Sequence, residues 1–149
     1  MLDEVARLAA AHEIRSVKIR YFRYVDLAMW VPLRTLFTDD AVLQMPQIWP
    51  APKSADEAVA SFARTLSVRD SVHTGSSSDI TVTSDRTARG SWVMDDRLYR
   101  AGTSDLAGDH RLIHGFGVYE ETYLRSADGW RIQTLTLTRT RVDGFVTLE

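Results

Sequence analysis

Cysteine is absent from the 149 residues of this sequence. Its absence excludes disulfide bonds, thiolate nucleophiles and metal sites built on cysteine. Proline is scarce, with four residues, and three of them fall within residues 46–52. No apolar run reaches the length of a membrane-spanning helix, and the acidic N-terminus does not have the pattern of a signal peptide. We therefore expect a cytoplasmic protein.

Neither sign of charge dominates, because 18 basic residues stand against 20 acidic ones and the net charge is −2. Such a balance gives no electrostatic footprint for nucleic acid. The sequence has no glycine-rich phosphate loop, no paired-histidine zinc motif and no nucleophile elbow. Its four histidines are not closely spaced, which argues against a bound metal. We expect a small molecule as the ligand, with no cofactor, metal, nucleic acid or membrane as a partner.

The length and the 44% share of hydrophobic residues suit one domain spanning residues 1–149. Apolar residues recur at helical spacing over residues 3–11 and 13–27, which predicts two helices. A short third helix is expected at residues 30–37, followed by a strand at 41–45. After the proline-rich loop, a candidate lid, Ser54 and Glu57 have capping-box spacing at the start of a helix that runs to about residue 66.

From residue 68 onward the apolar pattern has period two. It predicts strands at residues 71–82, 87–98, 110–125 and 130–142, with a long loop at 99–109. Helices followed by long antiparallel strands indicate an α+β fold, and a curved antiparallel or mixed sheet wrapped by the N-terminal helices would form a cone around a pocket. In the last strand the apolar face changes parity between Ile132 and Leu135. That change predicts a bulge near Gln133 and an outward face of threonines.

Asp26 and His73 are the first candidates for chemistry. Taken alone, Asp26 reads as an exposed residue of the turn that ends a helix, and His73 as a structural histidine. Paired, they would be a general base, because an aspartate that accepts from one imidazole nitrogen fixes the tautomer and raises the basicity of the other nitrogen.

His114 and Arg139 are the next candidates. His114 shares strand parity with Phe116 and Val118, which predicts that it points into the core or a cavity, either as a buried structural histidine or as a second acid. Arg139 shares parity with Leu135 and Leu137 and so needs a partner. That partner would be Glu120, Glu121 or Asp26, or an anionic group of the ligand.

Large apolar side chains are available for the walls of a pocket, although aromatic residues at such spacings also suit a simple core. The candidates for substrate contacts are Trp30, Trp49, Phe62, Trp92, Met94 and Phe116, with Tyr24 nearby.

The sequence resembles SnoaL-like proteins of the nuclear transport factor 2-like superfamily. The resemblance lies in residues 13–26, in residues 30–42, in Val72-His73 at the start of a strand, and in the ending from Tyr119 through Asp128-Gly129-Trp130 to Arg139. It implies an α+β cone with a deep pocket that dimerises through its sheet.

Within this superfamily, scytalone dehydratase and hexachlorocyclohexane dehydrochlorinase use a histidine–aspartate pair. The resemblance places that pair on His73 and Asp26, with His114 near the second histidine of the dehydratase and Arg139 near an arginine of the dehydrochlorinase. The dehydratase has a tyrosine just before its aspartate, where this sequence has Val25, and Tyr24 is the candidate substitute.

These features give three hypotheses. The first is a cofactor-independent lyase, either a dehydratase or a dehydrohalogenase, in which His73 removes a proton while His114, Tyr24 or Arg139 assists the leaving group of a mostly apolar cyclic substrate. The second is an isomerase or a polyketide-type cyclase that uses the same base. The third is a ligand-binding or accessory subunit without catalysis. A homodimer or higher homo-oligomer is expected.

Overall fold

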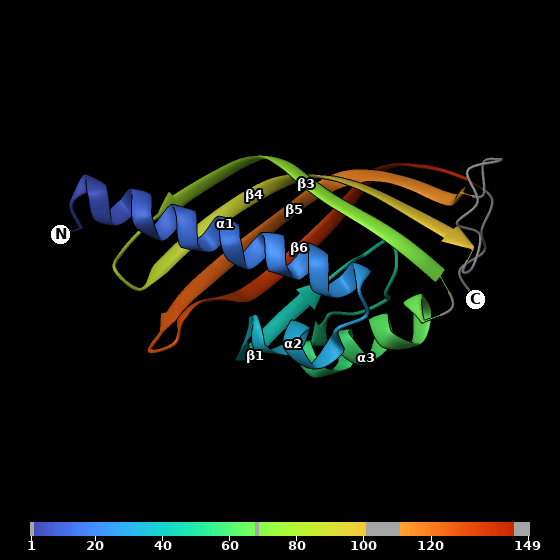
Figure 1. Cartoon of the computed structure of the whole chain (residues 1–149), viewed down its shortest axis with the longest axis horizontal. Helices are drawn as coiled ribbons and strands as arrows, with labels where there is room; N and C mark the ends of the chain where they lie inside the picture. Colours follow the sequence, from blue (N-terminus) through green and yellow to red (C-terminus); the bar gives the residue numbers. More distant parts are fainter. Residues whose placement is uncertain (1, 68, 101–110, 145–149) are drawn as a thin grey trace.

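The structure is a computed structural model that describes residues 2–67, 69–100 and 111–144. These residues contain three helices and a six-stranded sheet (Figure 1). The elements are α1 (Glu4–Asp26), α2 (Trp30–Thr35), β1 (Phe37–Gln44), β2 (Lys53–Ser54), α3 (Ala55–Leu66), β3 (Arg69–Val82), β4 (Thr87–Arg100), β5 (Arg111–Ser126) and β6 (Gly129–Asp143). Of the loop expected at residues 99–109, Tyr99 and Arg100 belong to β4, and the rest lies outside the described residues.

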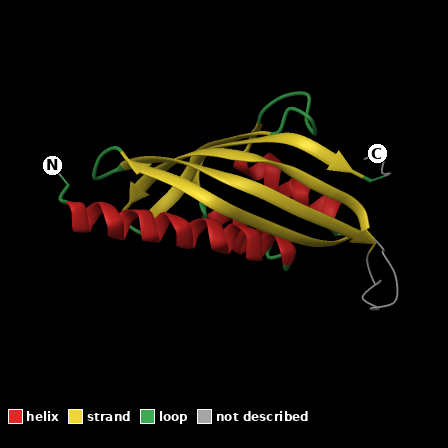
Figure 2. Cartoon of the chain, turned by 90° about the horizontal axis from the view of Figure 1, so that it is seen from above, coloured by secondary structure: helices red, strands yellow, loops and turns green. Residues whose placement is uncertain are grey.

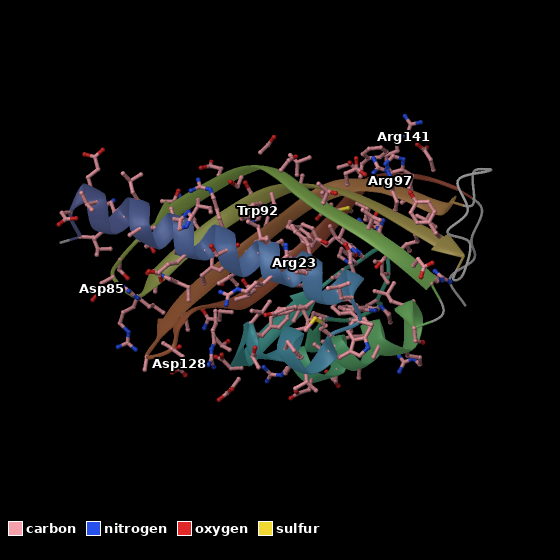
Figure 3. All side chains as sticks on the ribbon, viewed as in Figure 1. Arg23, Asp85, Trp92, Arg97, Asp128 and Arg141 are labelled. Atoms are coloured by element: carbon pink, nitrogen blue, oxygen red, sulfur yellow. The ribbon has the colours of Figure 1, made fainter. Side chains whose placement is uncertain are left out.

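The sheet is mixed, curved and open, with strand order β2-β1-β6-β5-β4-β3. β1 pairs with β6 in parallel, and the other neighbouring strands are antiparallel. The sheet curves over α1, which runs along its inner face (Figure 2). Asp85 lies in the turn after β3 and Asp128 in the turn after β5 (Figure 3). The predicted α+β architecture is therefore confirmed.

The prediction of two helices within residues 3–27 is wrong in one respect, because this segment forms a single helix of 23 residues. No glycine or proline interrupts residues 9–14, so nothing breaks the backbone there. Asp3 caps the helix by accepting from the Ala6 N–H at 2.7 Å. The buried stripe, which turns Tyr21 and Val25 toward the sheet, consists of Ala10, Ile14, Val17, Tyr21 and Val25, with Lys18 and Phe22 beside it.

The bulge predicted near Gln133 is confirmed. Thr122 lies opposite Thr134, whereas its neighbour Tyr123 lies opposite Ile132, so Gln133 is the extra residue of β6. A second irregularity follows at Thr140, because Gly117 pairs with Arg139 and Phe116 with Arg141. The bulge at Gln133 turns Leu135 and Leu137 inward and leaves the threonines of β6 on the outer face.

A charged pair is buried in the core between α1 and the sheet. Lys18 forms a salt bridge with Glu121, and both side chains are fully buried. The Lys18 ammonium also lies 3.5 Å from the ring centre of Tyr119, a cation–π contact. Glu121 accepts from the Tyr123 hydroxyl, which in turn accepts from the Trp92 indole at 3.1 Å. Burial lowers the pKa of Lys18, and Glu121 opposes that shift.

The Lys18→Met variant should lose about 3–5 kcal/mol of unfolding free energy, because it leaves the Glu121 carboxylate buried without its counter-ion. The matched control is Arg20→Met on the exposed side of the same helix, which should change that free energy by no more than about 0.5 kcal/mol. Urea unfolding of both variants measures the difference. Equal effects would show that the buried pair contributes nothing specific.

Candidate active site

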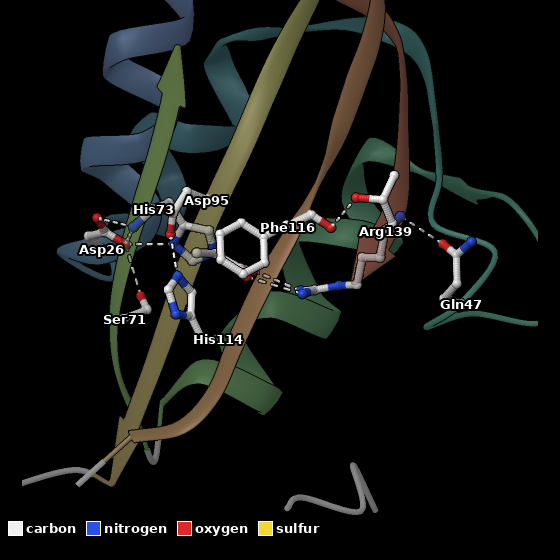
Figure 4. A network of polar contacts seen from close by, with 10 residues as sticks. Asp26, Gln47, Ser71, His73, Asp95, His114, Phe116 and Arg139 are labelled. Carbon is white, nitrogen blue, oxygen red and sulfur yellow. Dashed lines mark hydrogen bonds and ion pairs between the residues drawn. The ribbon is translucent and has the colours of Figure 1, made fainter. Parts of the chain in front are cut away.

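The Asp26 carboxylate and the His73 imidazole meet where the end of α1 reaches β3. Asp26 Oδ1 lies 2.6 Å from His73 Nδ1 (Figure 4). The backbone N–H of His73 donates to both carboxylate oxygens at 3.2 and 3.0 Å, and the Ser71 hydroxyl donates to Oδ1 at 3.0 Å. These donors compensate a carboxylate at the negative end of a helix. Since the carboxylate accepts, Nδ1 carries the hydrogen and the neutral ring keeps its lone pair on Nε2.

A glycine lets the helix approach the strand this closely. A Cβ atom at Gly75, two residues after His73, would lie 2.5 Å from the Phe22 ring of α1. Any side chain there would push the helix away from β3, and Asp26 is at the end of that same helix.

The His73 side chain, 11% exposed, borders a cavity of about 630 Å³ including its open mouth. The walls are mostly apolar and include Met45, Ile48, Leu98 and Leu137. Trp49 and Phe62 line it as predicted, with ring centres 5.6 Å apart. The proline-rich segment before β2 and helix α3 supply these two rings, which makes that segment part of the cavity rim.

A second ion pair lies on the far side of the imidazole. Arg139 holds Asp96 with two hydrogen bonds of 3.1 and 2.7 Å, and Asp96 Oδ2 lies 3.9 Å from His73 Nε2. The expectation that Glu120, Glu121 or Asp26 would pair with Arg139 is therefore wrong. Asp96 was recognisable as a candidate, since it continues the inward parity of Trp92 and Met94 on β4.

Two tyrosines in the cavity wall were also missed. Tyr21 and Tyr119 line the cavity and are almost fully buried, with their ring centres 6.1 Å apart. Burial raises the pKa of both phenols, and neighbouring carboxylates raise it further. Both phenols therefore remain neutral, and each hydroxyl can donate one hydrogen bond. The signal was the place of Tyr21 in the buried stripe, five residues before Asp26.

Residues 6–136 match the family model of the SnoaL-like domain. The chain belongs to this family.

Solved structures with the same fold agree along nearly the whole chain. A protein from Kribbella flavida is 20% identical with a TM-score of 0.79, and the match covers 91% of this chain and 93% of that one. A scytalone dehydratase candidate from Novosphingobium aromaticivorans is 17% identical, with a TM-score of 0.77 and coverage of 94% and 90%. A hexachlorocyclohexane dehydrochlorinase from Novosphingobium barchaimii is 17% identical, with a TM-score of 0.76 and coverage of 97% and 99%.

In this SnoaL-like chain, His114 and Phe116 are not in the cavity, so the prediction that they face it is wrong. Between residues 113 and 119 of β5 the buried residues are Ile113, Gly115, Gly117 and Tyr119, and His114 and Phe116 alternate with them on the outer face. There His114 Nε2 lies 2.8 Å from Asp95 Oδ1, and its ring stacks 4.4 Å from that of Phe116. The error has a physical reason: glycines fill two of the inward positions, so the outward set looked more apolar in the sequence.

Four further predicted contacts are also wrong, because the residues belong to the core and not to the cavity wall. They are Tyr24, Trp30, Trp92 and Met94. Met94 is fully buried, and Trp92 donates to Tyr123. Tyr24 and Trp30 are half-buried against the core, and Tyr21 is the tyrosine that helix geometry turns into the cavity.

Within residues 2–67, 69–100 and 111–144, no three histidine, cysteine, aspartate or glutamate side chains are grouped as metal ligands. Over the same residues, no helix is both long and apolar enough to cross a bilayer.

Tyrosine ionisation gives a test of the buried phenols. In the folded protein, Tyr21, Tyr119 and Tyr123 should stay protonated at about pH 11, where free tyrosine is ionised, because burial raises the pKa of all three. The phenolate absorbance of the folded protein should therefore reach that of all five tyrosines only on unfolding. The unfolded chain releases these protons above about pH 10, so the unfolding free energy should fall as the pH rises further. Full ionisation of the folded protein at that pH would contradict the burial of these hydroxyls.

Proposed function

We propose that this protein is a cofactor-independent lyase, a dehydratase or dehydrohalogenase, that acts on a small, mostly apolar cyclic substrate. The observation that carries the proposal is the Asp26–His73 hydrogen bond, which leaves His73 Nε2 on the border of an apolar cavity. An imidazole oriented in this way is a general base suited to neutral pH.

In the proposed reaction, His73 Nε2 takes a proton from a carbon next to the carbon that bears the leaving group. The electrons of the broken C–H bond form a carbon–carbon double bond, and the leaving group departs with its own bonding electrons as hydroxide or halide. The Asp26 carboxylate stabilises the imidazolium, which then returns its proton to the departing hydroxide or to water. Such a base contributes about 10²–10⁴-fold to the rate.

Tyr21 is the group that we propose assists the leaving group, in place of His114, Tyr24 or Arg139. It lines the cavity near Asp96 and Asp26, both of which affect its ionisation. A neutral phenol in a cavity that excludes water donates a strong hydrogen bond to an oxygen or halide on which negative charge develops. Two of the three similar structures, a scytalone dehydratase candidate and a dehydrochlorinase, are consistent with elimination chemistry.

An isomerase or polyketide-type cyclase is the second candidate. It is favoured by the same Tyr21–Tyr119 pair, because a phenol that donates into the cavity suits an enolate oxygen as well as a leaving group. The products distinguish the two reactions: elimination removes water or a hydrogen halide, whereas isomerisation leaves the mass unchanged.

The base is tested with a panel of halogenated and hydroxylated ring compounds, by measuring released halide and product mass. His73→Ala and Asp26→Asn should each lower kcat by about 10²-fold or more, because one removes the base and the other its orienting carboxylate. The matched control is His114→Gln, which alters the histidine–aspartate pair of the outer face and should leave kcat within about twofold. Full turnover by folded His73→Ala would refute the mechanism.

We further infer that the protein is a homodimer joined through the outer face of its sheet. Two valines on that face are unusually exposed: Val72 at 44% and Val93 at 46%. Val93 lies in the same cross-strand row as Val118 of β5 and Thr138 of β6, which gives a weakly polar surface across the middle of the sheet.

Light scattering after size-exclusion chromatography should give twice the chain mass, and Val93→Arg should give a monomer of unchanged helix and strand content. The control is Val31→Arg, since Val31 is 81% exposed on α2 and lies away from the sheet face. A wild-type monomer would contradict the inference.

A further inference from the structure

Two hydrogen-bonded pairs lie beside the cavity: Asp26 with the His73 imidazole, and Asp96 with Arg139. We propose that Asp96 and Arg139 make this cavity selective for electrically neutral ligands, with Asp96 as the residue that excludes anions. The inference refines the substrate class of the proposed lyase and rests on that proposal only in assigning the substrate to this cavity.

The pair is built into three neighbouring strands. Asp96 extends from β4 and Arg139 from β6, and they meet across β5 at Gly115, the residue paired with Asp96. A Cβ atom at Gly115 would lie 2.0 Å from Arg139 Nη1 and 2.2 Å from Asp96 Oδ1. The fold therefore keeps this position free of a side chain, and the ion pair occupies the space.

The charge of Arg139 is poorly accessible to water, so the guanidinium depends on its ion pair with Asp96. Asp96 is 1% exposed and the Arg139 side chain 12%, so both are largely removed from water. The two-point contact matches the planar guanidinium and is the strong form of this ion pair. If Arg139 left it to bind an anionic ligand, Asp96 would remain buried without a counter-ion, which is strongly unfavourable.

The remaining groups that face the imidazole leave no unbalanced positive charge. Asp26 lies against Nδ1, and Asp96 lies 3.9 Å from Nε2. Tyr21 and Tyr119 are neutral, because burial raises the pKa of both. Among the described residues of the wall, Arg139 carries the only permanent positive charge, and Asp96 neutralises it. A charged ligand would enter an apolar cavity without a free partner.

Three probes of nearly equal shape test the proposal: benzamide is neutral, benzoate is an anion and benzamidinium is a cation. Their affinities are measured by chemical-shift titration of the wild type, Asp96→Asn, Arg139→Gln and the double variant. The wild type should bind benzamide more tightly than either ion. Asp96→Asn frees Arg139 and should raise the benzoate-to-benzamide affinity ratio about tenfold or more. Arg139→Gln should instead raise the ratio for benzamidinium, and the double variant should again prefer benzamide.

Several results would overturn the proposal. These are a wild type that binds benzoate at least as tightly as benzamide, a wild type that binds none of the probes, or a folded Asp96→Asn protein with an unchanged ratio. If the Asp96→Asn variant does not fold, the three affinities of the wild type still test the proposal. An Arg139 that could leave Asp96 to bind the ligand would make the wild type prefer benzoate. None of the probes reacts, so failure of the lyase proposal would appear in the His73→Ala turnover and leave these ratios unaffected.

Discussion

The site depends on one contact, the hydrogen bond between the Asp26 carboxylate at the end of α1 and the His73 imidazole on the inner face of β3. Three hydrogen donors from β3 converge on Asp26: the His73 ring, the His73 backbone and the Ser71 hydroxyl. They join the helix end to the strand at a place where helix geometry alone would disfavour a negative charge. The close approach of Phe22 to Gly75 secures the same junction by packing. The orientation of the base is therefore a consequence of how the helix docks.

Around this junction, the polar groups of the cavity wall are closer to water than the polar groups of the core behind it. The cavity wall carries the two phenols and the Asp96–Arg139 pair, and the fully buried Lys18–Glu121 pair lies deeper, against the ring of Tyr119. Each charge has a partner at bonding distance, which is the condition for keeping charged groups in an apolar interior. Such a network holds the side chains in single positions, and a preorganised site needs that property.

Much of this arrangement could be predicted from the sequence. Helical and strand periodicity gave the architecture, the capping box at Ser54 was found where expected, and the parity change in β6 located the bulge at Gln133. The resemblance identified Asp26, the last residue of α1, and His73, which lies in β3 four residues after its start and not at the start that the sequence predicted. The inward row of β5 could not be read correctly, since Gly115 and Gly117 carry no side chain and conceal its parity. The sequence showed that Arg139 needs a partner. It could not identify Asp96, because that pairing depends on how β4, β5 and β6 align, and the residue pattern of one strand does not give this alignment.

Asp95 and Asp96 are adjacent in β4 and serve opposite faces of one sheet, the first with His114 outside and the second with Arg139 inside. A shift of β4 by one residue would reverse every side chain in the strand. Asp95 and Arg97 would then face the ligand, and Asp96 would face the exterior. The charge pattern of the interior therefore depends on the backbone alignment of β4. The β3–β4 hairpin, which helps to fix this alignment, determines ligand choice as much as the residues that touch the ligand do.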